Sequence, residues 1–386
     1  MVSRYEVQRI SDFAEIKTGP FGSALHQADY KATGTPIVTV EHLGERGIIH
    51  ENLPLVGEED LKRLSTYKCR EGDILFSRVG SIDRNAIVKR EEVDWLFSGR
   101  LLRVRVDRRK VDSGYLSQVF HTESFKDKVR SVAVGQTMPS LNTQILGGLT
   151  VNLPSLDEQK VVAGRLGSAD QLIESLKRLA SKKQAIKQGM MQELLTGRTR
   201  LQGFSKSWQA TTFGDLVRIQ RGSVLTRAQA GSGRIPVVAG GKTPAGYTDK
   251  ANRVGRTITI SASGASAGYV ALYNEPIFAS DCSTISSSRH YDLDFIYYSL
   301  LLRQDDIYRA QTGGAQPHIH ACDVYPMEIR VPTDMQEQIA IAQVLVDADK
   351  EIMALERRLE SARGIKQGMM QELLTGCTKL VPEGVR

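Results

Sequence analysis

The chain has 386 residues, of which 41% are hydrophobic and 25% charged, and its formal net charge is +7. This composition is ordinary for a globular chain of two or three domains. No run approaches about 18 consecutive apolar residues and the N-terminus lacks the apolar core of a signal peptide, so we expect no membrane span and no export, and we predict a cytoplasmic protein. The four cysteines are scattered without a CxxC pair, which favours neither a disulfide framework nor a zinc ribbon.

Residues 1–154 are predicted to form a first domain that mixes strands and helices. Strands are expected at 73–79 and 101–106, where aliphatic residues are dense. The Gly-, Ser- and Thr-rich stretches between such segments are expected to be loops.

Residues 155–200 are predicted to contain one helix of about forty residues, or about 60 Å. Ser155 and Glu158 have the spacing of an N-terminal capping box, and Gly197 falls where a C-terminal cap belongs. Apolar residues recur at steps of three and four and form a single seam: Val162, Leu166, Ala169, Ile173, Leu176 and Ala180.

Residues 201–332 repeat the first domain in outline and are predicted to form a second mixed domain, with a strand at 257–261. The segment "FSRVGSIDRNAIV" (76–88) matches "ISASGASAGYVAL" (260–272) in pattern, and "GQTMPSLN" (135–142) matches "GGAQPHIH" (313–320). Between Leu216 and Asn274 the only acidic residue is Asp249, against eight basic ones: Arg218, Arg221, Arg227, Arg234, Lys242, Lys250, Arg253 and Arg256. Such a run favours a polyanionic partner, although charge runs are more often solvated faces.

Residues 333–386 are predicted to contain a second long helix, with Thr333 and Gln336 at capping-box spacing. Its seam repeats that of the first helix: Ile341, Leu345, Ala348, Ile352, Leu355, Leu359 and Ala362. A helix with one seam must cover it, so we predict that the two helices pair antiparallel, as a coiled coil. The predicted fold is therefore α+β, with two mixed α/β domains separated and braced by two long antiparallel helices in an internal pseudo-twofold repeat.

The segment "IKQGMMQELLTG" occurs at 186–197 and again, letter for letter, at 365–376. A mid-helix glycine costs about 1 kcal/mol relative to alanine, and close backbone approach at a helix crossing would explain why both copies carry one. Core packing is the simpler interpretation of the apolar positions, and docking of a partner on a Met-rich surface is the other. The residues assigned to helix pairing or partner docking are Gly189, Met190, Met191, Leu194, Gly368, Met369, Met370 and Leu373.

The order domain, helix, domain, helix resembles the specificity subunit of type I restriction-modification systems over the whole chain. The most specific pieces are the duplicated "KQGMMQELLTG", "IKTGPFGSAL" (16–25) and "EGDILFSRVG" (71–80). The resemblance implies target recognition domains at 1–154 and 201–332 and helix regions at 155–200 and 333–386.

The resemblance also implies a division of labour. Each recognition domain would read one half of a bipartite, asymmetric site in double-stranded DNA, while the helices set the spacing and dock two modification subunits. Those partners would methylate adenine with S-adenosylmethionine, and restriction subunits would use ATP and Mg²⁺. This chain would be a non-catalytic reader without a cofactor, and it has no NPPF or DPPY motif, no FxGxG loop and no complete Walker A. A methylation-only or related phage-defence complex without a restriction subunit is the alternative.

Base-reading residues are expected to be polar side chains on loops, because guanine, adenine and the other bases offer distinct patterns of donors and acceptors. In the first domain these are Arg78, Arg84, Asn85, Gln136, Thr137 and Asn142, and in the second they are Lys242, Ser263, Ser266, Gln316, His318 and His320. Phosphate contacts, which fix register without reading sequence, are assigned to Arg100, Arg103, Arg105, Arg218, Arg221 and Arg256. Salt bridging within the domain is the alternative for these arginines.

Three shorter patterns imitate other sites. "GGKT" (240–243) lacks the spacing of a phosphate-binding loop, and Glu158 with Lys160 imitates part of a nuclease motif at a helix start. His318, His320 and Cys322 could face one side of a strand, but no fourth ligand is evident, and we predict no metal site. A freestanding enzyme and a coiled-coil scaffold without a DNA role remain alternative functions; turnover by the isolated chain would indicate the first, and absence of salt-dependent DNA affinity the second.

Overall fold

The computed structural model describes residues 5–20, 25–26, 29–45, 47–135, 139–225 and 233–375. The chain forms two compact units, residues 1–176 with 358–386 and residues 177–357. Each unit contains one mixed domain and a part of both long helices, so the boundaries predicted from sequence, which separate domains from helices, stay predictions. Within the described ranges, no helix is long and apolar enough to cross a membrane.

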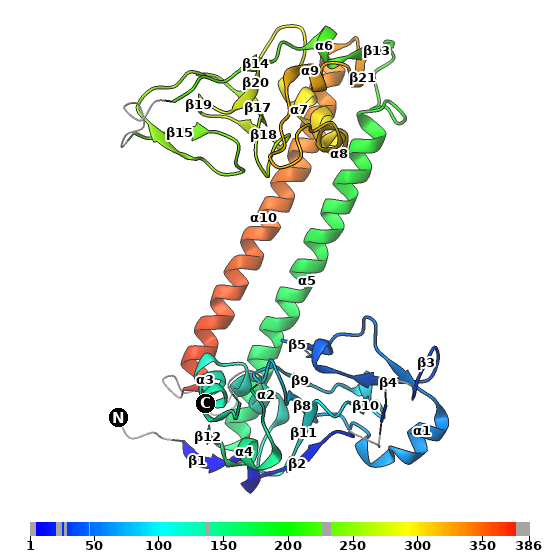
Figure 1. Ribbon diagram of the computed structural model, residues 1–386, viewed down its shortest axis with the longest axis vertical. Coiled ribbons are helices and arrows are strands. Elements are labelled where there is room, and N and C mark those ends of the chain that lie inside the picture. Colours follow the sequence, from blue (N-terminus) through cyan, green and yellow to red (C-terminus); the bar gives the residue numbers. More distant parts are fainter. Residues whose placement is uncertain are drawn as a thin grey trace, which may run out of the picture. The chain divides into compact units, whose positions relative to one another are not determined.

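Among its described residues, the first unit contains twelve strands and four short α-helices; Figure 1 shows their arrangement. The strands are β1 (Glu6–Arg9), β2 (Ala14–Thr18), β3 (Tyr30–Lys31), β4 (Thr35–Val38), β5 (Leu43–Gly44), β6 (Gly47–Ile48), β7 (Leu55–Val56), β8 (Ile74–Ser77), β9 (Asn85–Ile87), β10 (Leu96–Phe97), β11 (Leu101–Val106) and β12 (Thr150–Leu153). The helices are α1 (Glu58–Arg63), α2 (Ser113–Phe120), α3 (Glu123–Val132) and α4 (Thr143–Gly148).

Strand β8 is buried along its whole length because both faces of its sheet are covered. The sheet has the order β2-β11-β8-β9 and is antiparallel. Since successive side chains point to opposite faces, Ile74 and Phe76 join the core that includes Phe120 on α2, while Leu75 joins a second core with Phe97 on β10. The second sheet, β10-β4-β7-β3, contains the parallel pair β4 and β10.

The second unit repeats this arrangement. Its strands are β13 (Trp208–Thr212), β14 (Gln220–Arg221), β15 (Ile235–Val238), β16 (Gly246–Thr248), β17 (Thr257–Ser261), β18 (Val270–Tyr273), β19 (Phe278–Ala279), β20 (Cys282–Ser286) and β21 (Glu328–Pro332). Its short helices are α6 (Phe213–Leu216), α7 (Leu293–Leu302), α8 (Gln304–Arg309) and α9 (Ala321–Val324).

The two domains share one topology. The sheet β14-β20-β17-β18 corresponds to β2-β11-β8-β9, and the parallel pair β15 and β19 corresponds to β4 and β10. The antiparallel pair β13 and β21 corresponds to β1 and β12. The strands predicted at 73–79, 101–106 and 257–261 are confirmed as β8, β11 and β17.

The two long helices, α5 (Leu156–Leu194, 39 residues) and α10 (Met335–Leu374, 40 residues), have the predicted length. Ser155 caps α5, because its Oγ accepts a hydrogen bond from Glu158 N at 3.4 Å. The cap predicted for the second helix is wrong by one residue: Asp334 Oδ1 accepts from Gln336 N, while the Thr333 hydroxyl donates to Ser207 O. Gly197 has a φ of +70°, as a C-terminal cap requires, whereas Gly376 lies outside the described residues.

The predicted seams are buried except at Ala169, Ala348 and Leu359, which are half-buried, and the ends of the seams enter the domain cores. Val162 and Leu166 on α5 belong to the core of the first unit, and Ile341 and Leu345 on α10 belong to that of the second. Within the second unit the helices run antiparallel, because Lys187 pairs with Asp349 and Gln184, earlier on α5, contacts Glu356, later on α10. The α+β fold with paired helices is therefore confirmed.

The repeated segment closes a domain core at each of its two positions. Met191 and Leu194 are buried in the core of the second unit, with Met190 packed against it. Leu373 is buried in the core of the first unit, where Met369 and Met370 pack. Core packing is thus the role of these methionines and leucines, and the buried ones are not free to dock a partner.

The close backbone approach predicted at Gly189 is wrong. Gly189 and Gly368 are exposed, and a Cβ at either would meet no heavy atom within 4 Å in the described part of the chain. At both glycines the helix backbone is therefore exposed, and no other described part of the chain packs against it.

Candidate nucleic-acid interface

In the first domain, two loops are joined by backbone hydrogen bonds. Gly80 N donates to Pro139 O at 3.0 Å, and Leu141 N donates to Arg78 O at 2.8 Å. Ser140 also exchanges two backbone hydrogen bonds with Val134, at 2.9 and 3.2 Å. These bonds hold the loop after β8 against the loop before α4.

The second domain has the same bonds at equivalent positions. Gly264 N donates to Pro317 O at 3.0 Å, and Ile319 N donates to Ala262 O at 3.0 Å. His318 exchanges two backbone hydrogen bonds with Thr312, at 2.8 and 2.9 Å. We call this arrangement the clasp: it joins 78–80 to 139–141 in the first domain and 262–264 to 317–319 in the second. The match predicted between these loops from sequence is confirmed.

Each clasp requires a glycine because of its backbone conformation, and not because a side chain would lack space. Gly80 and Gly264 both have a φ of +80°, a conformation that L side chains rarely adopt. Among the described residues, no heavy atom lies within 4 Å of a Cβ built on either one. Because the clasp consists of main-chain bonds, the side chains around it can differ between the two domains without loss of the framework.

The residue whose carbonyl supports the clasp carries opposite charge in the two domains. Arg78 N donates to Arg100 O at 2.9 Å, and Ala262 N donates to Asp281 O at 3.1 Å. Arg100 immediately precedes β11, and Asp281 immediately precedes the equivalent strand β20. The same position therefore presents a guanidinium in one domain and a carboxylate in the other.

Sequence-predicted residues of the second domain converge on its clasp. The Ser263 hydroxyl donates to Oδ2 of Asp281, and Lys242 Nζ lies 5.4 Å from the centre of the Tyr269 ring. Ser261 Oγ donates to Gly240 O at 2.8 Å, which joins the loop of Lys242 to β17. The structure thus brings Lys242 and Ser263 to the loops that carry Ser266, Gln316 and His318. His320 lies one residue beyond the clasp, at the start of α9, where its backbone N–H donates to Asp323.

The residues predicted for the first domain lie in different settings. Arg78 and Arg84 are half-buried and donate to backbone carbonyls, of Gly99 at 3.3 Å and Leu43 at 2.7 Å respectively. Arg100 is exposed beside the clasp. Gln136 and Thr137 lie outside the described residues.

Asn85 is placed differently from the prediction, whereas Asn142 is exposed next to the clasp residue Leu141, and its assignment to DNA stays a prediction. Asn85 is only 1% exposed; it accepts a hydrogen bond from Ser117, and its amide lies 3.5 Å from Nδ1 of His121, so it supports α2 rather than facing DNA. Burial lowers the pKa of His121 to about 4, which keeps the imidazole neutral beside that amide. Asn142 caps α4, because its Oδ1 accepts from Ile145 N at 2.7 Å.

Several arginines assigned to phosphates bind carboxylates of their own domain. Arg103, 2% exposed, pairs with Glu15, and Arg105 donates twice to Asp73 at 2.7 Å. Arg256 donates to Asp294 through two nitrogens, at 2.6 and 2.9 Å. Arg103 and Arg105 are thus engaged inside the domain, while Arg256 is salt-bridged but exposed, as Arg218 and Arg221 are. The assignment of the exposed arginines to phosphates stays a prediction.

Asp281 and Tyr269 were not predicted from the sequence. An acidic residue is not expected on a surface that contacts phosphates. The equivalence of Asp281 with Arg100 is also hidden in the sequence, because the loop before the strand is one residue shorter in the second domain. Their equivalence could have been predicted only from their position, because each residue directly precedes one of two corresponding strands.

The segment 240–243 and the residues His318 and His320 lie in settings that differ from a phosphate loop and from a cluster of metal ligands. The segment 240–243 leads from β15 into strand β16 instead of a helix, so it lacks the helix N-terminus that a phosphate loop uses. The rings of His318 and His320 are parallel at 6.3 Å, and neither joins a group of three metal-capable side chains within the described ranges.

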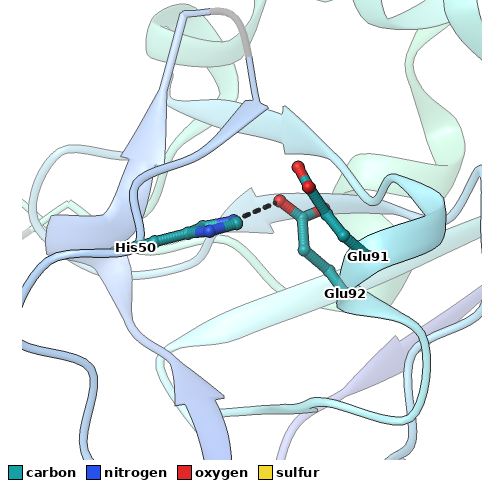
Figure 2. Close-up of side chains that lie close together, drawn as sticks. All are labelled: His50, Glu91 and Glu92. Carbon is teal, nitrogen blue, oxygen red and sulfur yellow. Dashed lines mark hydrogen bonds and ion pairs between the residues drawn. The ribbon is translucent and has the colours of Figure 1, made fainter.

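A different group gathers His50, Glu91 and Glu92, with ligand atoms within 4.8 Å of one another (Figure 2). The buried Glu92 carboxylate already accepts from Lys89 N at 2.6 Å and lies 2.8 Å from Nε2 of His50. These contacts account for the position of Glu92 as a cap of the short 3-10 helix Arg90–Glu92.

Comparison with known proteins agrees with this architecture. The family model of the type I restriction modification DNA specificity domain matches residues 3–187 and 205–362. A putative type I restriction enzyme MjaX specificity subunit of Methanocaldococcus jannaschii is 28% identical over 96% of this chain and 93% of its own length. The MjaVIII specificity subunit of the same organism is 24% identical over 52% of this chain, which spans about half (48%) of that relative.

Solved structures show the same fold. The type I restriction-modification S subunit of M. genitalium superposes with a TM-score of 0.71 at 15% identity, covering 98% of both chains. Since the family model matches most of the sequence in two copies, one over each mixed domain, the chain belongs to the DNA specificity subunits of type I restriction-modification systems.

Proposed function

We propose that this chain is the non-catalytic reader of a type I complex, in which each recognition domain reads one half of a bipartite, asymmetric site in double-stranded DNA. The observation that carries the proposal is the clasp, a shared main-chain frame surrounded by different side chains. Because the same backbone hydrogen bonds occur in both domains, the loops that would read DNA lie at equivalent positions within their domains. The exchange of Arg100 for Asp281 gives those surfaces different chemistry, so the two half-sites should differ.

The exposed cations suit the non-specific part of DNA binding. Arg100 in the first domain and Arg218, Arg221 and Lys242 in the second are exposed. When such cations bind phosphates they displace the counterions of the DNA, and the affinity for DNA therefore falls steeply as the salt concentration rises. Base readout would come from the polar side chains at each clasp.

The helices would set the separation of the half-sites and dock two modification subunits. The docking surface that we propose is the exposed face of the repeated segment, on which Ile186 is 44% and Ile365 61% exposed. Gly189 and Gly368 lie one turn further along, at the bare positions described above. In the first unit a cavity of about 210 Å³ lies beside Ile365 and is lined with apolar side chains including Leu172 and Leu176.

Identity at exposed positions is the argument for a common partner. The fold accounts for the buried residues of the repeated segment and for the lysine of each copy, which pairs with an aspartate of the other helix, but not for its exposed residues. The neighbouring parts of the two helices have diverged, from "LGSADQLIES" at 166–175 to "LVDADKEIMA" at 345–354. Two identical exposed surfaces fit two copies of one partner. The modification subunits would hold S-adenosylmethionine, and restriction subunits, where present, would hold ATP and Mg²⁺; the complex would act in the cytoplasm.

Mapping of methylated bases tests the proposal. The chain is co-expressed with the modification subunit of its own system in a host without adenine methylation, and methylated adenines are located across the genome. We expect one discontinuous motif with two unlike halves and a fixed spacer. A continuous motif, a palindrome or no methylation would contradict the proposed function.

A further inference from the structure

We propose that Asp281, oriented by Ser263, is a specificity-determining residue of the second domain and accepts a hydrogen bond from the exocyclic amino group of one adenine or cytosine. This inference rests on the proposed function and adds to it the class of base that the second domain selects at one position.

The carboxylate is held at the clasp by its surroundings. Asp281 O accepts from Ala262 N at 3.1 Å, which fixes its backbone against the clasp, and Oδ2 accepts from the Ser263 hydroxyl. Asp281 is half-buried, and within the described ranges no hydrogen bond to Oδ1 is present. One oxygen is therefore used for orientation and the other is available to a ligand.

The space beside the carboxylate is kept open by glycine. A Cβ built on Gly240 would lie 3.4 Å from Oδ2 of Asp281 and 2.5 Å from Ser263 O, so any larger residue would collide with the clasp. The loop of Gly240 continues to the exposed Lys242. The same loop therefore carries an exposed cation, which suits a phosphate, two residues after the glycine that borders the Asp281 carboxylate.

Charge restricts what Asp281 can contact. The proposed contact is in the major groove, where all four base pairs can be told apart. A carboxylate is repelled by phosphates and by the acceptors on guanine N7 and O6 and thymine O4, so the donors left on base edges in that groove are the amino groups of cytosine N4 and adenine N6. Arg100, at the equivalent position of the first domain, has the opposite preference for acceptors. The two domains should therefore read different bases at equivalent positions of their half-sites.

The test is selection from a randomised duplex library by the assembled complex with its modification subunit, comparing wild type, Asp281→Asn, Asp281→Ala and Ser263→Ala. Asp281→Asn keeps the shape and the acceptor for Ser263 but adds an amide donor, so we expect one base pair of the second half-site to lose its preference for an amino group. Asp281→Ala should reduce discrimination at that base pair by roughly 5- to 150-fold, and Ser263→Ala should weaken it at the same position. Asp249→Asn, which removes an exposed acid of the same domain, is the matched control and should leave the motif unchanged.

The outcomes separate this inference from the proposed function. If wild type selects a bipartite motif and every variant selects the same motif, Asp281 only supports the clasp and the inference is overturned. A uniform loss of affinity for all sequences, with the motif unchanged, overturns it as well. If wild type itself selects no bipartite motif, the proposed function fails first.

Discussion

Lys187 Nζ on α5 lies 2.6 Å from Oδ1 of Asp349 on α10. The same bond occurs at the equivalent positions of the first unit, where Lys366 on α10 lies 2.8 Å from Asp170 on α5. Each lysine belongs to one copy of the repeated segment, and each aspartate also accepts a hydrogen bond from its own recognition domain, from Tyr298 at 2.7 Å or from Gln118 at 3.0 Å. The repeated segment thus fixes the register of the helices and attaches each domain to them.

Removal of Lys187 should destabilise the fold more than removal of an ordinary surface lysine. Lys187→Met leaves Asp349 with Tyr298 alone; the lysine is 17% exposed and also lies over the Tyr298 ring, 5.2 Å from its centre. We expect the free energy of unfolding to fall by about 1–3 kcal/mol. The control, Lys183→Met, breaks a more exposed pair with Glu351 (33% and 51% exposed) and should cost less than about 1 kcal/mol. Urea unfolding followed by circular dichroism measures both, and equal losses would argue against a special role for Lys187.

The features that could be predicted from sequence are local or repeated. The apolar period of α5 and α10 depends on neighbours three and four residues away, so the seams and helix lengths were predictable. The clasp loops were found because the chain carries them twice, with Gly80 and Gly264 at the same point of each pattern. The cap at Asp334 was missed because Thr333 offered an equally suitable oxygen one residue earlier.

Contacts between distant residues were not predictable from one sequence. Glu337 is fully buried and accepts from Arg200 at 2.6 and 2.9 Å and from the indole of Trp208 at 3.2 Å, yet nothing near it in sequence indicates these partners. The same holds for Asn85, whose loop setting suggested a base contact although the fold turns its side chain toward α2. Whether a polar loop residue lies at the surface or in the core can be decided only when the element that packs against it is known.

The stability of the first unit should depend on pH through His121. Its pKa is lowered from 6.5 to about 4 by burial first, then by Lys366 and Lys126, with Glu45 and Asp170 opposing. The unfolded chain therefore binds a proton at a higher pH than the folded one, and the resulting stability, on the order of 3 kcal/mol, is complete above 6.5 and lost as the pH falls toward 4.

Urea midpoints at pH 7, 5.5 and 4.5 check this dependence. His121→Gln, which cannot titrate, should lose less stability over that interval than the wild type does. His290→Gln, a change at an exposed histidine, should follow the wild type. Parallel curves for wild type and His121→Gln would show that His121 does not contribute.

Lengthening both helices should change the spacer of the DNA motif. Seven residues inserted after Leu176 and seven after Arg357 preserve the seam, because they add two turns, and lengthen each helix by about 10.5 Å. If the helices set the separation of the half-sites, the spacer grows by about three base pairs, at 3.4 Å each, while both halves keep their sequence. Methylome mapping of the variant gives the answer, and a spacer of the original length would exclude this role. Insertion in α5 alone should instead prevent the pairing of α5 with α10, because the two lysine–aspartate pairs could no longer form together.

The exposed glycines of the repeated segment should show opposite effects on stability and on partner binding. Gly189→Ala and Gly368→Ala relieve a helix cost of about 1 kcal/mol each and meet no described atom, so the chain should become more stable. If a partner backbone lies against this bare surface, each added methyl group should weaken docking of one modification subunit, and the double variant should lose both.

The matched control is Gly164→Ala, at another exposed mid-helix glycine of α5 whose Cβ would also meet no described atom within 4 Å. It should raise the melting temperature to a similar extent and leave the stoichiometry with the modification subunit, measured by analytical ultracentrifugation, at two. Because the control shares the exposure and the gain in helix propensity with both glycines, and the helix with Gly189, any difference in partner binding comes from the position alone. Unchanged binding in the Gly189 and Gly368 variants would contradict docking at the repeated segment. The identity of the exposed residues in its two copies would then need another explanation.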